Sequence, residues 1–160
     1  MKKLIILLLC CIILSACSQS VFSPANTEST HIIQTPTPMN ITIYSGNELC
    51  DGFETTDYEV FYYNSATLIE KLTEQGVLTN DIELLSEEYD GTCLHLDFNE
   101  AFRNLINSMG TAGEYIIIGS VVNTFLDNYG DLASSVFITV NGEIFESGHV
   151  IYDFELTHYE

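Results

Sequence analysis

The sequence predicts an α+β fold for residues 40–160, and three observations carry this prediction. Short segments of alternating apolar residues, such as 136–140, are typical of strands with one buried face. Apolar residues recur at spacings of three and four over 111–129, which is typical of a long helix. Tight-turn pairs at Asp90-Gly91 and Asn141-Gly142 indicate hairpins, which outnumber the possible crossovers. We therefore expect a single mixed or mainly antiparallel sheet packed on two to three helices.

Local signals define the boundaries of the expected elements. Ser65 can cap a helix that Gly76 closes, and Asn99 can cap a short helix that carries Phe102. The 111–129 segment has a second apolar row, so this long helix should be covered on more than one side. In chain order, strands are expected over 41–44, 58–63, 81–87, 92–98, 136–140, 143–145 and 150–156.

The charge balance excludes several classes of protein. The 160 residues contain 23 Asp and Glu against four Lys and Arg, a net charge of −19. Without the first 17 residues only Lys71 and Arg103 remain as bases, and the net charge becomes −21. Such a surface cannot neutralise phosphates, so neither a nucleic-acid partner nor electrostatic adhesion to anionic lipid is expected. A protein partner should instead present a basic or cation-bridged surface.

The first 17 residues have the organisation of an export signal. Two lysines precede an eleven-residue apolar segment, 4–14, which as a helix would be about 16 Å long, half of a membrane's hydrocarbon core. Leu14-Ser15-Ala16-Cys17 resembles the lipobox of bacterial lipoproteins, in which cleavage before the cysteine leaves its thiol acylated. We therefore expect a lipoprotein signal peptide over 1–17, with Cys17 as the lipid carrier. The protein would be lipid-anchored at the extracytoplasmic face of a cell membrane.

The residues after this signal predict a tether and one domain. Residues 18–39 are rich in Ser, Thr, Pro, Asn and Gln and show no sustained period, which is typical of a flexible linker. Such a linker reaches roughly 25 Å. It would let an acidic domain, 40–160, stand away from a negatively charged membrane surface.

Several short motifs follow one another in a characteristic order across 40–156. The most specific are Leu96-Asp97-Phe98, Val122-Asn123-Thr124-Phe125 and Val140-Asn141-Gly142-Glu143, the last followed by Gly148-His149. This order, preceded by a lipobox, resembles the GerMN domain, named after the sporulation and germination lipoprotein GerM of spore-forming Firmicutes. The family-motif residues are Tyr44, Asp97, Phe102, Asn123, Gly142, Gly148 and His149, each with an expected structural role.

The resemblance implies a fold similar to the ring-building modules of secretion and sporulation assemblies, and a non-catalytic role in assembly. Two departures limit what it implies. The proline that usually precedes the middle hairpin is absent around 77–81, and only one GerMN unit fits this length. A tandem interface is therefore not expected here.

Candidate sites for chemistry are weak. Cys93, His95 and Asp97 alternate on one strand, but residues two apart on a strand are ~6.6 Å apart, too far for a nucleophile to hydrogen-bond its base. No CxxC or HxxxH pair supports a zinc site there. Ser147 and His149 also alternate on an extended segment, without the GxSxG turn of hydrolases. We expect no catalytic residue, metal or cofactor.

Cys50 and Cys93 are the only thiols outside the signal segment and Cys17. In an exported protein an even number of cysteines is compatible with a disulfide, which would contribute about 3–4 kcal/mol in the chain-entropy model. In an anaerobic host both thiols could remain reduced. The sequence leaves these two alternatives open.

These observations predict an extracytoplasmic GerMN lipoprotein that acts by protein–protein contact in envelope or spore assembly, as a monomer or an oligomer. One alternative is an envelope lipoprotein that binds a ligand or a cation. A less favoured alternative is a small hydrolase that uses His95 or His149.

Overall fold

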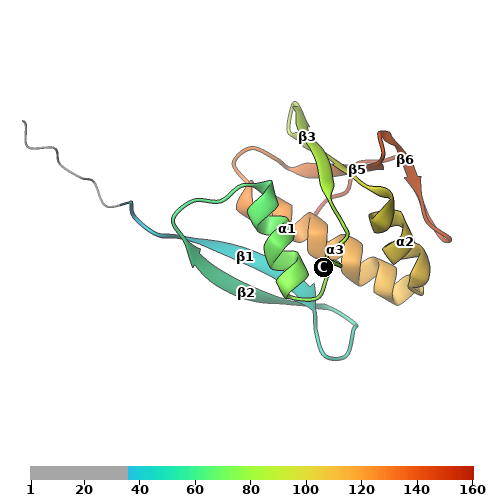
Figure 1. Ribbon diagram of the computed structural model, residues 1–160, viewed down its shortest axis with the longest axis horizontal. Coiled ribbons are helices and arrows are strands. Elements are labelled where there is room, and N and C mark those ends of the chain that lie inside the picture. Colours follow the sequence, from blue (N-terminus) through green and yellow to red (C-terminus); the bar gives the residue numbers. More distant parts are fainter. Residues whose placement is uncertain (1–35) are drawn as a thin grey trace, which may run out of the picture. The chain divides into compact units, whose positions relative to one another are not determined.

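The computed structural model describes residues 36–160, which form three helices and two sheets (Figure 1). The helices are α1 (Ser65–Glu74), α2 (Glu100–Ser108) and α3 (Thr111–Asn128). The strands are β1 (Met39–Gly46), β2 (Phe53–Val60), β3 (Leu84–Asp90), β4 (Cys93–Phe98), β5 (Ser135–Val140), β6 (Glu143–Glu146) and β7 (Ile151–Tyr152). The expected α+β class is confirmed.

The larger sheet has the strand order β3-β4-β5-β6-β7. β4 and β5 are parallel, and α2 and α3 connect them; the other neighbouring pairs are antiparallel. This sheet is mixed and mainly antiparallel, as expected. Its two hairpin turns carry the left-handed glycines that the sequence indicates, Gly91 with φ 63° and Gly142 with φ 75°.

The expected single sheet is corrected to two, because β1 and β2 form a separate antiparallel pair. The edge of β1 that faces away from β2 lies against α3 instead of another strand. There the Thr42 N–H donates to the Asn128 side chain and the Tyr44 N–H donates to Thr124 Oγ1. Helix side chains thus satisfy the backbone groups that a neighbouring strand would otherwise pair with.

Strand boundaries differ from expectation where pairing decides them. β2 begins at Phe53 and ends at Val60, because it pairs in register along the whole of β1. β3 begins three residues later than expected, at Leu84, and the last expected strand is reduced to Ile151–Tyr152 plus a single bridge from Leu156 to β5.

The cap of helix α1 is Asn64, one residue before the expected cap. The Asn64 side chain, not Ser65, accepts the Thr67 N–H at 3.0 Å. Gly76 follows the end of the helix with φ 74°, as a glycine at this position should. Asn99 precedes α2 without a side-chain cap bond, and its amide donates to the Asp81 carbonyl instead.

Helix α3 lies at the centre of the domain, and twelve of its 18 residues are buried. β1 packs on one side of it, and α1, α2 and β5 cover others, which confirms that it is covered on more than one side (Figure 1). Phe102 of α2 stacks on Phe98 with ring centroids 4.3 Å apart and meets Phe145 edge-on, so the motif phenylalanine belongs to the core.

The expected signal peptide, Cys17 and residues 18–35 of the tether lie outside the described residues. Within residues 36–160, no helix is both long enough and apolar enough to cross a membrane.

Candidate functional site

The residues on which the resemblance to GerMN domains rests, apart from Phe102, gather in three hydrogen-bonded clusters, two of them on α3. One cluster closes the β5–β6 turn, one holds the loop between β6 and β7, and one holds two extended segments against α3. In order along the chain the six residues are Tyr44, Asp97, Asn123, Gly142, Gly148 and His149.

The first cluster joins the end of β4 to the β5–β6 turn. Asp97 Oδ1 accepts the Gly142 N–H and the Thr139 hydroxyl, each at 2.7 Å. Asn141 and Gly142 both have positive φ, 54° and 75°, the backbone that a two-residue hairpin turn requires. The two motifs that contain Asp97 and Gly142 therefore meet in one hydrogen bond that closes the β5–β6 turn.

The second cluster is built around Glu114, in the first turn of α3, whose exposed fraction is only 3%. Its Oε1 accepts the Ser147 hydroxyl at 2.5 Å and the Tyr152 hydroxyl at 2.7 Å. Its Oε2 lies 2.8 Å from His149 Nδ1. Ser147 Oγ in turn accepts the backbone N–H groups of His149 and Val150. The whole β6–β7 loop is thus tied to one buried carboxylate.

Burial raises the pKa of Glu114, but hydrogen bonds from Ser147, Tyr152 and His149 oppose this effect and outweigh it. The net pKa is lower than that of an ordinary glutamate. The positive end of the α3 dipole also favours a negative charge in the first turn. Glu114 is therefore an ionised acceptor, and burial together with this carboxylate raises the pKa of Tyr152.

A serine, a histidine and a carboxylate meet here, but not as a catalytic triad. In a triad the histidine bridges the nucleophile and the acid. Here Glu114 stands between the other two, so the Ser147 hydroxyl donates to the carboxylate and not to an imidazole nitrogen. The Gly148 N–H donates to Asn107 of α2 at 3.1 Å, which holds the same loop from a second helix.

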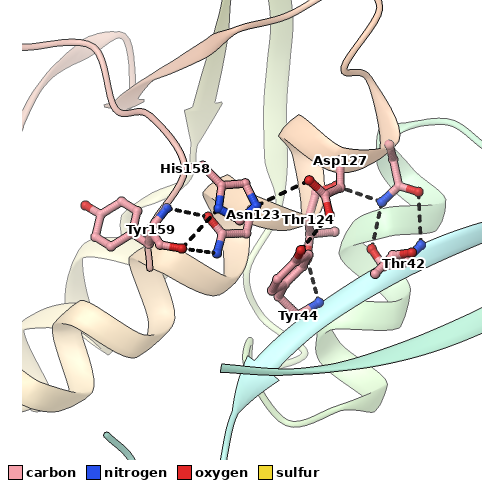
Figure 2. A network of polar contacts seen from close by, with 8 residues as sticks. Thr42, Tyr44, Asn123, Thr124, Asp127, His158 and Tyr159 are labelled. Atoms are coloured by element: carbon pink, nitrogen blue, oxygen red, sulfur yellow. Dashed lines mark hydrogen bonds and ion pairs between the residues drawn. The ribbon is translucent and has the colours of Figure 1, made fainter. Parts of the chain in front are cut away.

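The third cluster consists of two asparagines on α3 that bind backbone as another strand would (Figure 2). Asn123, fully buried, accepts the Tyr159 N–H at 2.8 Å and donates to the Tyr159 carbonyl at 3.0 Å. Asn128 accepts the Thr42 N–H at 3.1 Å and donates to the Thr42 carbonyl at 2.7 Å. α3 thereby fixes β1 and the C-terminal segment.

Tyr44 adds a side-chain contact to the same cluster. Its hydroxyl donates to Asp127 Oδ2 at 2.5 Å, and His158 Nε2 lies 3.3 Å from Oδ1 of the same carboxylate (Figure 2). The Tyr44 and His158 rings meet edge-on at 5.5 Å. Burial and Asp127 raise the pKa of Tyr44 to about 12. The tyrosine is a neutral donor, not a base.

The candidate strand face of β4 is not assembled for catalysis. Cys93 is buried, and burial raises the pKa of its thiol, the opposite of an activated nucleophile. The His95 ring packs on Phe137, and Asp97 is engaged in the turn described above. In the described part of the chain, no group of three or more His, Cys, Asp or Glu side chains is placed to hold a metal ion.

The two cysteines are free thiols, so of the two open alternatives the disulfide is not formed in this structure. Cys50, exposed in the β1–β2 loop, lines a depression with Gly113 from the first turn of α3. Cys93 pairs with Ser135, beyond the other end of that helix. An 18-residue helix is about 27 Å long, far more than the ~7 Å Cα separation that a disulfide allows.

Sequence reasoning missed Glu114, Asn107 and Asn128, although it singled out Ser147 and His149, which bind Glu114, and Gly148, which binds Asn107. One signal was available for Glu114, because an acid in an otherwise apolar helix that is covered on more than one side must find donors. Nothing local marks Asn107 or Asn128, whose partners lie 41 and 86 positions away in the chain.

Comparison with known proteins identifies similar folds. The tandem GerMN domains of the sporulation protein GerM from Bacillus subtilis are 17% identical, with a TM-score of 0.56 over 84% of this chain. This chain spans 50% of that structure. A protein from Clostridium perfringens described as a lipoprotein is 12% identical, with a TM-score of 0.44 over 75% of this chain and 87% of its own length, a similarity too low to support an inference. No family model and no curated protein matches. The chain therefore has a fold similar to that of GerMN domains.

Proposed function

We propose that this GerMN-like domain belongs to a sporulation-related envelope lipoprotein that acts through protein–protein contact, without catalysis, at the extracytoplasmic face of the membrane. The similarity of the fold to the GerMN domains of a sporulation protein carries this proposal. The lipobox pattern ending at Cys17 and the tether-like composition of 18–39 add the anchor. The chain spans 50% of the tandem structure, so the proposal is made for one GerMN-like unit.

The non-catalytic role draws support from how the polar side chains are used. In the first two clusters, the side chains that could serve as an acid or a nucleophile form hydrogen bonds that hold a turn or a loop. Ser147 is bound to Glu114, and Asp97 closes a turn. These contacts favour a scaffold role for Ser147 and Asp97 over a role as free reactive groups.

Anchoring is tested by replacing the lipid-carrying residue in the full chain. In the bacterial host, we expect wild type to be labelled by a fatty-acid analogue and to fractionate with membranes. Cys17→Ser should lose the label, and it should either leave the membrane fraction or retain an uncleaved signal. Cys50→Ser should keep both the label and the membrane fractionation of wild type. Equal labelling of Cys17→Ser and wild type would contradict the anchor.

Assembly is tested by crosslinking in growing and in sporulating cells, with mass spectrometry of the products. We expect one specific envelope protein to be captured by the wild-type chain, more strongly in sporulating cells. Failure to capture any protein from a scan of surface positions would contradict the assembly role.

Loss of a measurable hydrolytic activity in folded His95→Ala or His149→Ala variants would instead support the hydrolase alternative.

A further inference from the structure

The edge strands of the two sheets differ in whether they could accept another strand. α3 covers the edge of β1 and bonds its backbone. β3 has a register shift between Leu84 and Ser86, and β7 is only two residues long. β2, in contrast, pairs with β1 in continuous register over eight residues and contains no proline, and within residues 36–160 it pairs with no other strand. A long, regular edge of this kind is a template for an added strand.

The register shows which backbone groups of β2 point outward. Thr42 and Tyr44 direct their N–H groups to α3, away from β2. Residues directly opposite each other in an antiparallel pair exchange both hydrogen bonds or neither. Asp57 and Thr55, which lie opposite these two residues, therefore direct their N–H and C=O groups away from β1. Glu59, two positions farther along, continues this outward row.

The side chains of β2 alternate between two faces. Tyr58 and Val60 are half-buried and pack against the core. Thr55, Asp57 and Glu59 point to the opposite face, where they are exposed. An added strand would alternate in the same way, with one set of its side chains beside the half-buried pair and the other set beside the carboxylates.

The chain directly after β2 exposes two large rings. Phe61 is 58% exposed and Tyr62 is 78% exposed. They follow Val60, the last residue of the strand. Neighbouring exposed aromatic side chains are typical of contact surfaces. A strand added at this end of β2 would therefore cover apolar surface as well as backbone groups.

β2 is acidic, and the bases of the described residues are engaged elsewhere. The strand carries the carboxylates of Glu54, Asp57 and Glu59, none of which forms an ion pair within residues 36–160. Lys71 of α1 lies over the Tyr58 ring, 5.0 Å from its centroid, and is paired with Glu74. Arg103 of α2 is paired with Glu100. The exposed face of β2 thus favours a partner that carries positive charge.

We infer that the partner binds at the outer edge of β2 by adding an extended segment in which apolar residues alternate with Lys or Arg. This inference rests on the proposed assembly function and names the surface that would carry it out. The backbone of the segment would pair with the outward N–H and C=O groups of Thr55, Asp57 and Glu59. Its apolar side chains would lie beside Tyr58 and Val60, and its bases would lie beside the two exposed carboxylates.

The same carboxylates argue against a second copy of this chain as the occupant. Two β2 strands paired with each other would bring the three acids of each copy close together, and like charges on neighbouring strands are destabilising. A basic strand reverses the sign of this interaction. The acids therefore disfavour self-pairing at an otherwise open edge and select a basic partner.

The test uses the full chain in cells, with a photo-reactive amino acid in place of Thr55 on β2. The matched control places it at Ser86, which is also exposed and lies on the edge strand β3, where the register shifts. We expect position 55, and not position 86, to crosslink one protein. The crosslinked segment should alternate apolar residues with Lys or Arg.

The charge component is tested by Asp57→Lys, with Glu88→Lys on β3 as the control for an exposed acid on an edge strand. We expect roughly threefold weaker crosslinking from position 55 in Asp57→Lys, because the substitution places like charges side by side. Glu88→Lys should leave the crosslinking unchanged.

The backbone component is tested by comparing Glu59→Pro with Glu59→Gln. Both variants lose the same charge, but only proline removes the outward N–H, and an edge strand tolerates proline where that N–H faces solvent. We expect crosslinking from position 55 to be roughly tenfold weaker in Glu59→Pro than in Glu59→Gln, with the same thermal unfolding. If the proline lowers the unfolding temperature, the comparison of Asp57→Lys with Glu88→Lys decides.

Four results would overturn the β2 edge as the binding surface while leaving the assembly function intact. These are equal crosslinking in folded Glu59→Pro and Glu59→Gln, equal crosslinking in Asp57→Lys and Glu88→Lys, capture only from position 86, and capture from position 55 of a second copy, of residues 18–39 of the same chain, or of a helical or acidic segment. Absence of crosslinks from every scanned surface position would overturn the assembly function itself.

Discussion

The two ends of helix α3 perform similar tasks with different chemistry. At its first turn, the ionised Glu114 holds the β6–β7 loop through side-chain hydroxyls and an imidazole. Farther along, the neutral amides of Asn123 and Asn128 hold extended backbone. The loop offers side-chain donors, which two carboxylate oxygens satisfy, whereas a peptide offers one donor and one acceptor, which an amide matches. The contact at the first turn is therefore coupled to pH, and the amide contacts are not.

The largest effect is expected from removing the buried carboxylate. Glu114→Ala leaves the hydroxyls of Ser147 and Tyr152 without their acceptor in a buried site, which should lower the free energy of unfolding by about 3 kcal/mol. Urea denaturation measures this. The exposed Glu59→Ala control should change stability by less than about 0.5 kcal/mol. Equal effects of the two substitutions would mean that the cluster does not contribute to stability.

The amide contacts should be weaker than the carboxylate contact, but independent of it. Asn123→Ala removes two hydrogen bonds to Tyr159 and should cost about 2 kcal/mol. Hydrogen exchange at the Tyr159 amide should accelerate in this variant and not in Asn128→Ala, whose partner is Thr42. If both variants accelerate exchange equally at Tyr159, the two asparagines do not act as separate contacts.

Lowering the pH should weaken the Glu114 contact at the first turn of α3 and leave the asparagine contacts unchanged. Because the folded state lowers the pKa of Glu114, its contribution is complete above the unfolded value of about 4.3 and is lost as pH falls through the lower folded value. The stability of Glu114→Gln should therefore fall less steeply than that of wild type below this pH. Asn123→Ala should keep the wild-type slope. Parallel pH profiles for wild type and Glu114→Gln would contradict this coupling.

The smallest effect on stability is expected from Tyr44, an exposed member of the third cluster. Tyr44→Phe removes the hydroxyl bond to Asp127 but keeps the ring contact with His158, so a cost of about 0.5 kcal/mol is expected. Differential scanning calorimetry at neutral pH measures the shift. If Tyr44→Phe lowered the free energy of unfolding as much as Asn123→Ala does, the exposed hydroxyl bond and the buried amide contacts would contribute equally to stability.

Local signals in the sequence were enough to predict the hairpin turns and the helices. Gly76, Gly91 and Gly142 adopt the positive φ expected of them, and α3 begins at the predicted residue. These features depend on neighbours within a few positions, which sequence reading captures. The α+β class follows from their order.

The remaining differences arise where distant parts of the chain decide the outcome. β2 begins at Phe53 because β1 sets its register, and the sheet divides because α3 covers the edge of β1. Glu114 was missed because its partners lie 33 to 38 positions away. Family resemblance pointed to His149, which binds Glu114, and to Gly148, which binds Asn107, but a single sequence has no means to find these pairs.

The contact between β1 and α3 also determines an order of events during folding. Thr42 and Asn128 are 86 positions apart, so the edge of β1 stays uncovered until α3 has formed and packed against it. An isolated two-stranded ribbon is marginal in water, and contacts this distant slow folding because a long loop must close first. The amides of β1 should therefore gain protection together with α3. Until then the nascent hairpin exposes an open strand edge, and this is the interval in which a holding chaperone would be of most use.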